Sequence, residues 1–145
     1  MSLFVALSVS SSGMAAQRLR TEYLAENLAN AETTRTPEGG PYRRKDVVFQ
    51  TQAVATPFSS VFQSAMDSGL RGVEVADVLV DDRDPEKRFS PGHPDADKDG
   101  YVAFPRMNSA EEMVDLMSAS RSYQANIAAI TAVKDMILRS IDLLK

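Results

Sequence analysis

The sequence predicts a mainly α-helical chain with a small β-rich middle segment, in which long N- and C-terminal helices form a coiled-coil-like assembly domain. The stretch from Ser109 to Lys145 contains neither glycine nor proline, and the first 36 residues contain one glycine and no proline. All seven prolines and six of the seven glycines lie between Pro37 and Pro105, where they favour turns. We therefore expect an N-terminal helix over 1–36, a turn-rich segment over 37–105 and a C-terminal helix over 106–145.

The expected C-terminal helix has a clear start and a continuous apolar seam. Asn108 and Ser109 precede Glu111 and Glu112, a capping pattern that satisfies free amides of a first helical turn. Further along, side chains that are mostly apolar or aromatic recur in alternating steps of four and three, which is typical of a seam that packs on another helix. This stripe consists of Leu116, Ser120, Tyr123, Ile127, Ile130, Lys134, Ile137, Ile141 and Leu144.

The length of this helix predicts that it protrudes. At ~1.5 Å per residue it would run about 55 Å, whereas a compact chain of this size has a radius of gyration of roughly 15 Å. Its apolar seam must then be covered by the other long helix or by a neighbouring molecule. An ordinary core helix of a helical bundle is the alternative interpretation of the same pattern.

The expected N-terminal helix has apolar positions at helical steps from Phe4 to Ala31. A cluster of serines just before Gly13 predicts a break or bend, because hydroxyl groups compete for the backbone and glycine is entropically costly. Alanines around Asn27 and Asn30 form a small-residue surface that would let a partner helix approach closely. A solvated alanine-rich face is the alternative.

The middle segment contains several short runs of β-branched and aromatic residues. Val47–Phe49 and Val73–Val75 read as strands, Val78–Val80 reads as a continuation of the second strand past a bulge, and Tyr101–Phe104 reads as the last strand. The Ser- and Gln-containing stretch 56–69 is compatible with a loop or a short helix. A small β-rich unit between two helices is the expected result.

Composition excludes several classes of function. The net charge is −4 and no basic run exceeds Arg43–Lys45, which argues against a nucleic-acid surface. No stretch reaches the ~18 apolar residues of a membrane span.

Cysteine is absent, which excludes disulfides and thiolate metal sites. Leu3–Leu7 has the character of a signal-peptide core, but no basic residue precedes it, so we expect no cleavage there.

One acidic loop has part of a calcium-binding pattern. Asp95, Asp97, Asp99 and Gly100 match the first half of a calcium loop, in which alternate carboxylates face one cation. The twelfth position is Arg106, where such a loop requires a bidentate glutamate. We therefore expect a solvated acidic turn and no metal site.

Catalytic patterns are also missing from the sequence. The single histidine, His93, lies between glycine and proline and is expected to be a loop residue that hydrogen-bonds to backbone. There is no nucleophile-elbow motif and no glycine-rich phosphate loop leading into a helix with the required lysine. We expect neither enzyme activity nor a cofactor.

Several segments carry specific motifs, namely Asn27–Ala31, Thr33–Lys45, Ser90–Asp97, Gly100–Val102, Glu112–Asp115 and Ser120–Asn126. Together these segments closely resemble the proximal rod proteins of the bacterial flagellar basal body, within the family of flagellar rod and hook axial proteins. The resemblance spans nearly the whole chain. Glu32 stands where the family usually has asparagine, and Arg106–Met107 stands where it commonly has an Asn-Val pair.

The resemblance implies a structural subunit of the basal-body rod and not an enzyme. It implies export through the flagellar type III apparatus without a cleaved signal. It also implies helical assembly with copies of itself and with other proximal and distal rod proteins. The product of this assembly would be the hollow shaft that spans the periplasm and transmits torque from motor to hook. An MS-ring adaptor is a further candidate partner; nucleic acids and small-molecule substrates are not. The alternative is a secreted helical binding module or effector that pairs with a chaperone.

The candidate subunit-interface residues come from both terminal helices. They are Leu24, Asn27, Leu28, Asn30, Leu116, Tyr123, Ile127, Ile130, Ile137, Ile141 and Leu144.

Overall fold

The computed structural model describes residues 3–53 and 71–143. Along the chain, one long helix precedes and another follows a middle region of two short antiparallel sheets. This confirms the predicted mainly α-helical fold with a small β-rich middle. In chain order the elements are α1 (Leu3–Ala29), β1 (Lys45–Ala53), β2 (Arg71–Val80), β3 (Glu86–Phe89), β4 (Tyr101–Phe104) and α3 (Ser109–Asp142). The stretch 56–69 and Leu144 lie outside the described residues.

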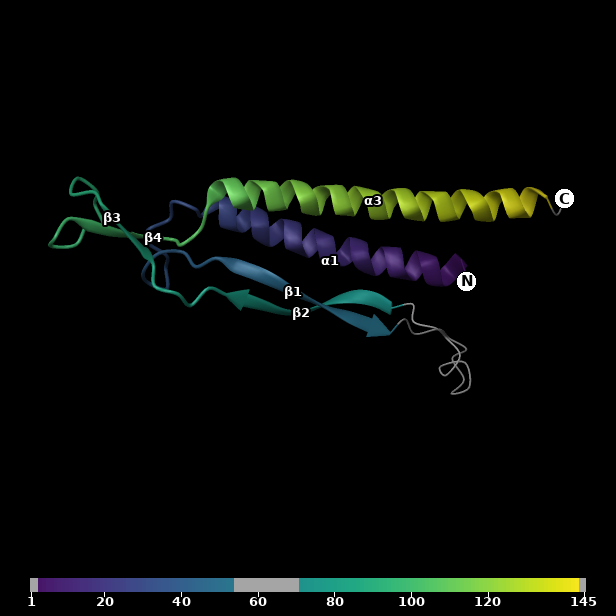
Figure 1. Ribbon diagram of the computed structural model, residues 1–145, viewed down its shortest axis with the longest axis horizontal. Coiled ribbons are helices and arrows are strands. Elements are labelled where there is room, and N and C mark those ends of the chain that lie inside the picture. Colours follow the sequence, from purple (N-terminus) through teal and green to yellow (C-terminus); the bar gives the residue numbers. More distant parts are fainter. Residues whose placement is uncertain (1–2, 54–70, 144–145) are drawn as a thin grey trace.

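The elements form an elongated molecule in which α1 is the middle layer (Figure 1). Helix α3 runs along one side of α1, and the β1–β2 hairpin runs along the other side. The β3–β4 hairpin projects at the end of the molecule that lies opposite both termini (Figure 1). Because α1 is covered from two sides and α3 from one, α3 is the more exposed of the two helices.

Helices α1 and α3 pack antiparallel in close contact. The side chain of Asn27 hydrogen-bonds to that of Glu112, and a Cβ atom added at Gly13 would lie 3.1 Å from Nδ2 of Asn126. The expected break at Gly13 was wrong, because α1 is one continuous helix. The glycine instead leaves room for the asparagine of the facing helix, and this close approach is favourable enough to offset the poor helix propensity of glycine.

The serine cluster also has a packing role. The hydroxyl of Ser12 donates to the carbonyl oxygen of Val9 at 2.8 Å and accepts a hydrogen bond from the backbone N–H of Val73 at 3.1 Å. Ser12 therefore joins α1 to strand β2. A two-stranded hairpin is only marginally stable alone, so this docking onto the helix supports the β1–β2 pair.

Helix α1 ends at Ala29, and the expectation that it continues to Thr36 was wrong. The backbone N–H of Tyr42 donates to the carbonyl of Thr33 at 3.0 Å, and that of Thr36 donates to the carbonyl of Gly40 at 2.8 Å. Gly40 has a φ of +78°, a conformation that glycine adopts without steric cost. The chain thus reverses immediately after the helix, and these turn hydrogen bonds replace the helical ones.

The sheets agree with the predicted strands and add one. In the β1–β2 pair, Val48 lies opposite Asp77 while Phe49 lies opposite Val75, so Ala76 is the extra residue of a bulge. This confirms the predicted interruption between the two halves of the second strand. Strand β3 was not predicted, since its sequence EKRF is charged and has little of the usual strand composition.

The start of α3 is capped by Asn108, one half of the expected capping pattern. The Oδ1 atom of Asn108 accepts a hydrogen bond from the N–H of Ala110 at 3.0 Å, which satisfies one free amide of the first turn. With 34 residues, α3 is ~51 Å long, and its last turns extend beyond the start of α1 (Figure 1). The predicted protrusion is confirmed. No helix among the described residues is long and apolar enough to cross a membrane.

The hydrophobic core is small for a chain of this length. The buried side chains that form the hydrophobic core of the described residues are Ala16, Leu24, Tyr42, Val102, Ala119 and Val133. Three of the six are alanine or tyrosine, and the two buried polar residues are Asn27 and Glu112. Polar contacts between segments therefore carry an unusual share of the packing.

Candidate functional site

A buried polar cluster, here called the polar joint, connects the ends of both helices to the start of β1. It consists of Asn27, Tyr42, Arg44 and Glu112. Asn27 is 0% exposed. Its Nδ2 amide donates to the carbonyl of Lys45 at 2.8 Å and to Oε2 of Glu112 at 3.0 Å. Its Oδ1 atom accepts from the Tyr42 hydroxyl and from the Lys45 N–H, both at 2.9 Å. Both donors and both acceptor sites of this amide are therefore satisfied.

The charged half of the polar joint is an ion pair between Arg44 and Glu112. Glu112 is 2% exposed, and its Oε1 atom is bound by Nε of Arg44. Burial is the largest single effect on Arg44 and works against its charge, but the hydrogen bonds and negative charges of Glu112 and Asp46 together outweigh it and raise the pKa of the guanidinium above its ordinary value. Because a buried carboxylate without a partner is strongly destabilising, this pair fixes the first turn of α3 against the segment that leads into β1.

Tyr42 is held in its neutral form. Burial, reinforced by the nearby Glu26 carboxylate, raises the pKa of its hydroxyl above the ordinary value of 10.0. The same carboxylate binds Nζ of Lys45 at 2.6 Å, and this ammonium group lies 5.8 Å from the ring centroid of Tyr42. The hydroxyl therefore remains available as the donor that Asn27 requires.

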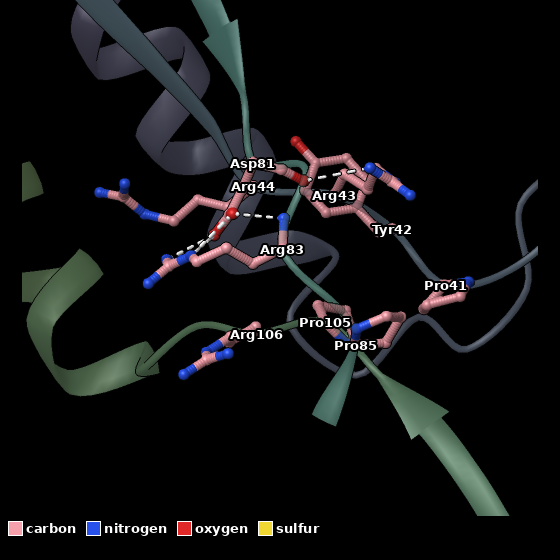
Figure 2. Close-up of a pocket in the computed structure, with 9 residues that line it drawn as sticks. All are labelled: Pro41, Tyr42, Arg43, Arg44, Asp81, Arg83, Pro85, Pro105 and Arg106. Carbon is pink, nitrogen blue, oxygen red and sulfur yellow. Dashed lines mark hydrogen bonds and ion pairs between the residues drawn. The ribbon is translucent and has the colours of Figure 1, made fainter. Parts of the chain in front are cut away.

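Next to the polar joint, a small pocket lies between the two hairpins and the segment leading into α3 (Figure 2). Arg83 binds Asp81 through Nε at 2.8 Å, and this hydrogen bond lowers the pKa of the Asp81 carboxyl from 3.8 to about 2. Figure 2 shows Pro85 and Pro105 among the lining residues, with Arg106 on the segment that leads into α3. The Asp81 carboxylate is already paired with Arg83, and Arg43 and Arg44 are paired with Asp82 and Glu112, so we assign the pocket a structural role.

The acidic loop uses its carboxylates to fix its own backbone. Oδ1 of Asp97 accepts from the N–H groups of Asp99 and Tyr101, at 2.9 and 2.8 Å. Nδ1 of His93 accepts from the N–H of Asp95 at 3.1 Å, which confirms the prediction of a loop histidine bonded to backbone. Within residues 3–53 and 71–143, no cluster of three or more histidine or acidic side chains is arranged to hold a metal ion.

The structure divides the predicted interface residues into three groups. Leu24 and Asn27 are 3% and 0% exposed and lie inside the protomer, so their role in this fold is internal packing. A second group is half-buried and comprises Leu28, Asn30, Leu116, Tyr123, Ile130 and Ile137. Ile127 and Ile141 are exposed, at 43% and 49%.

Sequence reasoning missed most of the exposed apolar side chains of α3. The outer apolar surface of α3, as the structure defines it, comprises Met113, Val114, Met117, Ile127, Met136, Leu138, Ile141 and Leu143. Each of these side chains is at least 43% exposed. The Met113 and Met117 pair, spaced one helical turn apart, was the available signal.

Comparison with known proteins assigns the family. The family described as "Flagella basal body rod protein" matches residues 7–35, and the one described as "Flagellar basal body rod FlgEFG protein C-terminal" matches residues 98–143. Flagellar basal-body rod protein FlgC of Borreliella burgdorferi is 40% identical over 152 residues, covering 100% of this chain and 99% of that protein. The chain belongs to the FlgC family of flagellar basal-body rod proteins.

Two further FlgC relatives give the same result. FlgC of Bacillus subtilis is 40% identical over 150 residues, covering 99% of each chain. FlgC of Salmonella typhimurium is 42% identical over 144 residues, covering 99% of this chain and 98% of the relative. The chain is therefore a structural subunit of the flagellar basal-body rod, as its motifs predicted. These matches give no support to the alternative of a secreted binding module.

The two family descriptions match segments of the chain that contain most of α1 and all of α3. Residues 7–35 cover most of α1 and the turn after it, and residues 98–143 cover β4 and α3. Both halves of the polar joint, Asn27 and Glu112, lie within the matched segments. The two family descriptions therefore match mainly the paired helices, whereas the FlgC relatives match nearly the whole chain.

Proposed function

We propose that this subunit assembles into the rod through its terminal helices, with the outer apolar surface of α3 as the principal contact. The observation that carries this proposal is the exposure of that surface along the whole length of α3, from Met113 at 51% to Leu143 at 87%. Apolar area of this kind contributes ~25 cal/mol per Å² when it is removed from water. A neighbouring helix that covers it would therefore stabilise an assembly.

The assembly domain in this proposal consists of residues 1–36 and 106–145, and residues 37–105 form the middle segment. The antiparallel packing of α1 on α3 and the polar joint support treating the two ends of the chain as one unit. The exposed Ile127 and Ile141 then contact neighbouring subunits in a coiled-coil-like arrangement, and the half-buried Leu116, Tyr123, Ile130 and Ile137 contribute at the edge of the α1–α3 seam.

The contact is heterologous in this proposal, since the outer apolar surface of α3 meets a different surface of the next subunit. Repeated heterologous contacts that do not close into a ring generate a helical filament, as a hollow shaft requires. The partners are copies of this chain and other proximal and distal rod proteins, with an MS-ring adaptor at one end. Rigid packing of this kind lets the rod pass torque from motor to hook.

Export in an unfolded state precedes assembly in this proposal. The small core and the absence of cysteine support it, because a chain with few buried apolar side chains and no disulfide unfolds at low cost. The location is then the basal body, with the rod spanning the periplasm after passage through the flagellar type III apparatus. No catalytic group and no cofactor takes part in this role.

Electron microscopy of purified basal bodies, labelled with an antibody against this chain, tests the proposed function. The antibody is expected to label the rod in preparations from the wild-type strain and to leave it unlabelled in a strain that lacks the chain. Intact basal bodies from the wild-type strain with no label on the rod, while the same antibody detects the chain elsewhere in the cell, would refute the assignment.

A further inference from the structure

The β3–β4 hairpin presents two aromatic side chains to solvent. Phe89 is 67% exposed and Tyr101 is 44% exposed. They lie directly opposite each other in the antiparallel register, and their rings meet edge to face with centroids 5.4 Å apart. Such an exposed pair is a candidate contact, because exposed aromatic surface gains free energy only when a partner covers it.

The position of the Phe89 ring is fixed by its surroundings. Gly100 has a φ of +81°, and a Cβ atom added there would lie 2.9 Å from the Phe89 ring and 3.2 Å from Cβ of Pro91. The ring therefore rests on a position that only glycine can occupy. On the other face of the hairpin, Val102 is 1% exposed, which anchors β4. A rigid exposed aromatic group loses little conformational entropy on binding, and such groups dominate binding energy at protein interfaces.

A positive charge lies beside the aromatic pair. Lys87 is two residues before Phe89 in the same strand, so both side chains project from the same face of the hairpin. Lys87 is exposed, and no described acidic group is within ion-pair distance of it. We call Lys87, Phe89 and Tyr101 the aromatic face.

The first turns of α3 present a surface of complementary chemistry. Met113, Val114 and Met117 are 51%, 60% and 49% exposed. A shallow depression beside them is lined by Ala110, Glu111, Val114 and Asp115. We call Glu111, Met113, Val114 and Met117 the acidic methionine patch. Thioether groups make favourable contacts with aromatic rings, and the carboxylate of Glu111 is available to pair with an ammonium group.

We propose that the aromatic face of one subunit docks on the acidic methionine patch of a second copy of this chain. Within one chain both surfaces remain exposed, and the β3–β4 hairpin projects away from α3 (Figure 1). The contact therefore forms between copies. It joins two different surfaces, so each bound subunit presents both surfaces again, and the contact propagates along a filament. This inference rests on the proposed function and identifies one specific contact within the rod.

Cross-linking between single-cysteine variants tests this docking. The chain has no cysteine of its own, and the rim substitutions Lys87→Cys and Glu111→Cys leave Phe89, Tyr101, Met113 and Met117 in place. The two variants are produced together in a strain that lacks the native copy, and purified basal bodies are treated with a short bis-maleimide. The expected product is a covalent dimer of the two variants, at least about tenfold more abundant than with either variant alone, because fixed proximity raises the effective thiol concentration.

The matched control pairs Lys87→Cys with Ala128→Cys. Ala128 is exposed on the same helix but lies roughly 25 Å farther along it than Glu111, so this pair is expected to stay at background. A photo-cross-linking phenylalanine analogue at position 89 adds a second readout, with a product of two copies of this chain expected. Assembled rods that give no dimer above the control, or a photo-product with a different protein only, would overturn the docking and leave the rod assignment standing.

Discussion

The Nδ2 amide of Asn27 donates a hydrogen bond to Oε2 of Glu112 at 3.0 Å and so joins the last turn of α1 to the first turn of α3. The two residues are 85 positions apart in the sequence. Both are buried, so the bond is protected from water and is sensitive to the loss of either partner. It fixes the relative position of α1 and α3, the two helices through which we propose that the rod assembles.

Asn27→Leu is expected to lower the free energy of unfolding by at least about 3 kcal/mol. The substitution leaves the Tyr42 hydroxyl, the Lys45 N–H and part of Glu112 buried without partners, and each such group costs ~1 to 3 kcal/mol. Denaturant unfolding of the purified monomer measures the change. Asn30→Ala is the control, because its amide bonds only to local groups of the same turn, and it is expected to cost less than about 1 kcal/mol. Equal effects would show that the polar joint does not fix the fold.

Arg83→Gln is expected to raise the pKa of Asp81 from about 2 toward its ordinary value of 3.8. The folded-state pKa is the lower one, so the ionised carboxylate stabilises the fold above pH 3.8, and this contribution is lost as the pH falls toward 2. A carboxyl-carbon NMR titration measures the shift directly. Arg18→Gln, which removes an exposed pair with Glu22, is expected to leave the Asp81 titration unchanged. An unaltered Asp81 titration in Arg83→Gln would contradict the assignment of Arg83 as the cause.

Gln17→Met is expected to stabilise the monomer by about 1 kcal/mol. Oε1 of Gln17 is buried and has no hydrogen-bond partner among the described residues. An unsatisfied buried acceptor is costly, whereas a methionine of similar shape has no such requirement. Gln124→Met, on the exposed side of α3, is the control and is expected to change stability by less than about 0.5 kcal/mol. A loss of stability in Gln17→Met would indicate that this oxygen has a bound water or another partner.

The sequence predicted the elements whose signals are local. The long helices followed from the distribution of glycine and proline, the cap at Asn108 from its side chain, and the bulge at Ala76 from the interruption between two valine-rich runs. Strand β3 was missed because only pairing with β4 makes its charged residues a strand. The end of α1 was missed because turn hydrogen bonds from Tyr42 decide it.

The face of α3 that packs on α1 was the harder problem. The stripe chosen from hydrophobicity follows the large side chains, whereas the most deeply buried apolar positions are Ala119 and Val133. Gly13 leaves room for Asn126 of α3, so the helices approach closely there. A prediction from hydrophobicity selects large side chains and so overlooks small ones such as Ala119. Asn27 was predicted at a subunit interface although it is internal, since its partner Glu112 is too distant in sequence to be paired by any local pattern.

Ile127→Asp separates folding from assembly. Ile127 is 43% exposed, so aspartate there is expected to lower the unfolding free energy of the monomer by less than about 1 kcal/mol. In an assembled rod, the same substitution removes apolar contact and buries an unpaired carboxylate, which is strongly unfavourable. Ile130→Asp is the contrasting variant, because Ile130 is half-buried in the α1–α3 seam and its replacement is expected to destabilise the monomer itself.

Electron microscopy of basal bodies and swimming assays of a strain that carries Ile127→Asp as its sole copy test the central claim most directly. Arg139→Gln, at an exposed position of α3, is the control, because it leaves every apolar side chain of the outer apolar surface of α3 in place, and it is expected to assemble normally. The account predicts that Ile127→Asp yields a monomer of near-normal stability that forms no rods and supports no swimming. Normal rods and normal swimming with Ile127→Asp would show that the outer apolar surface of α3 is not the assembly surface.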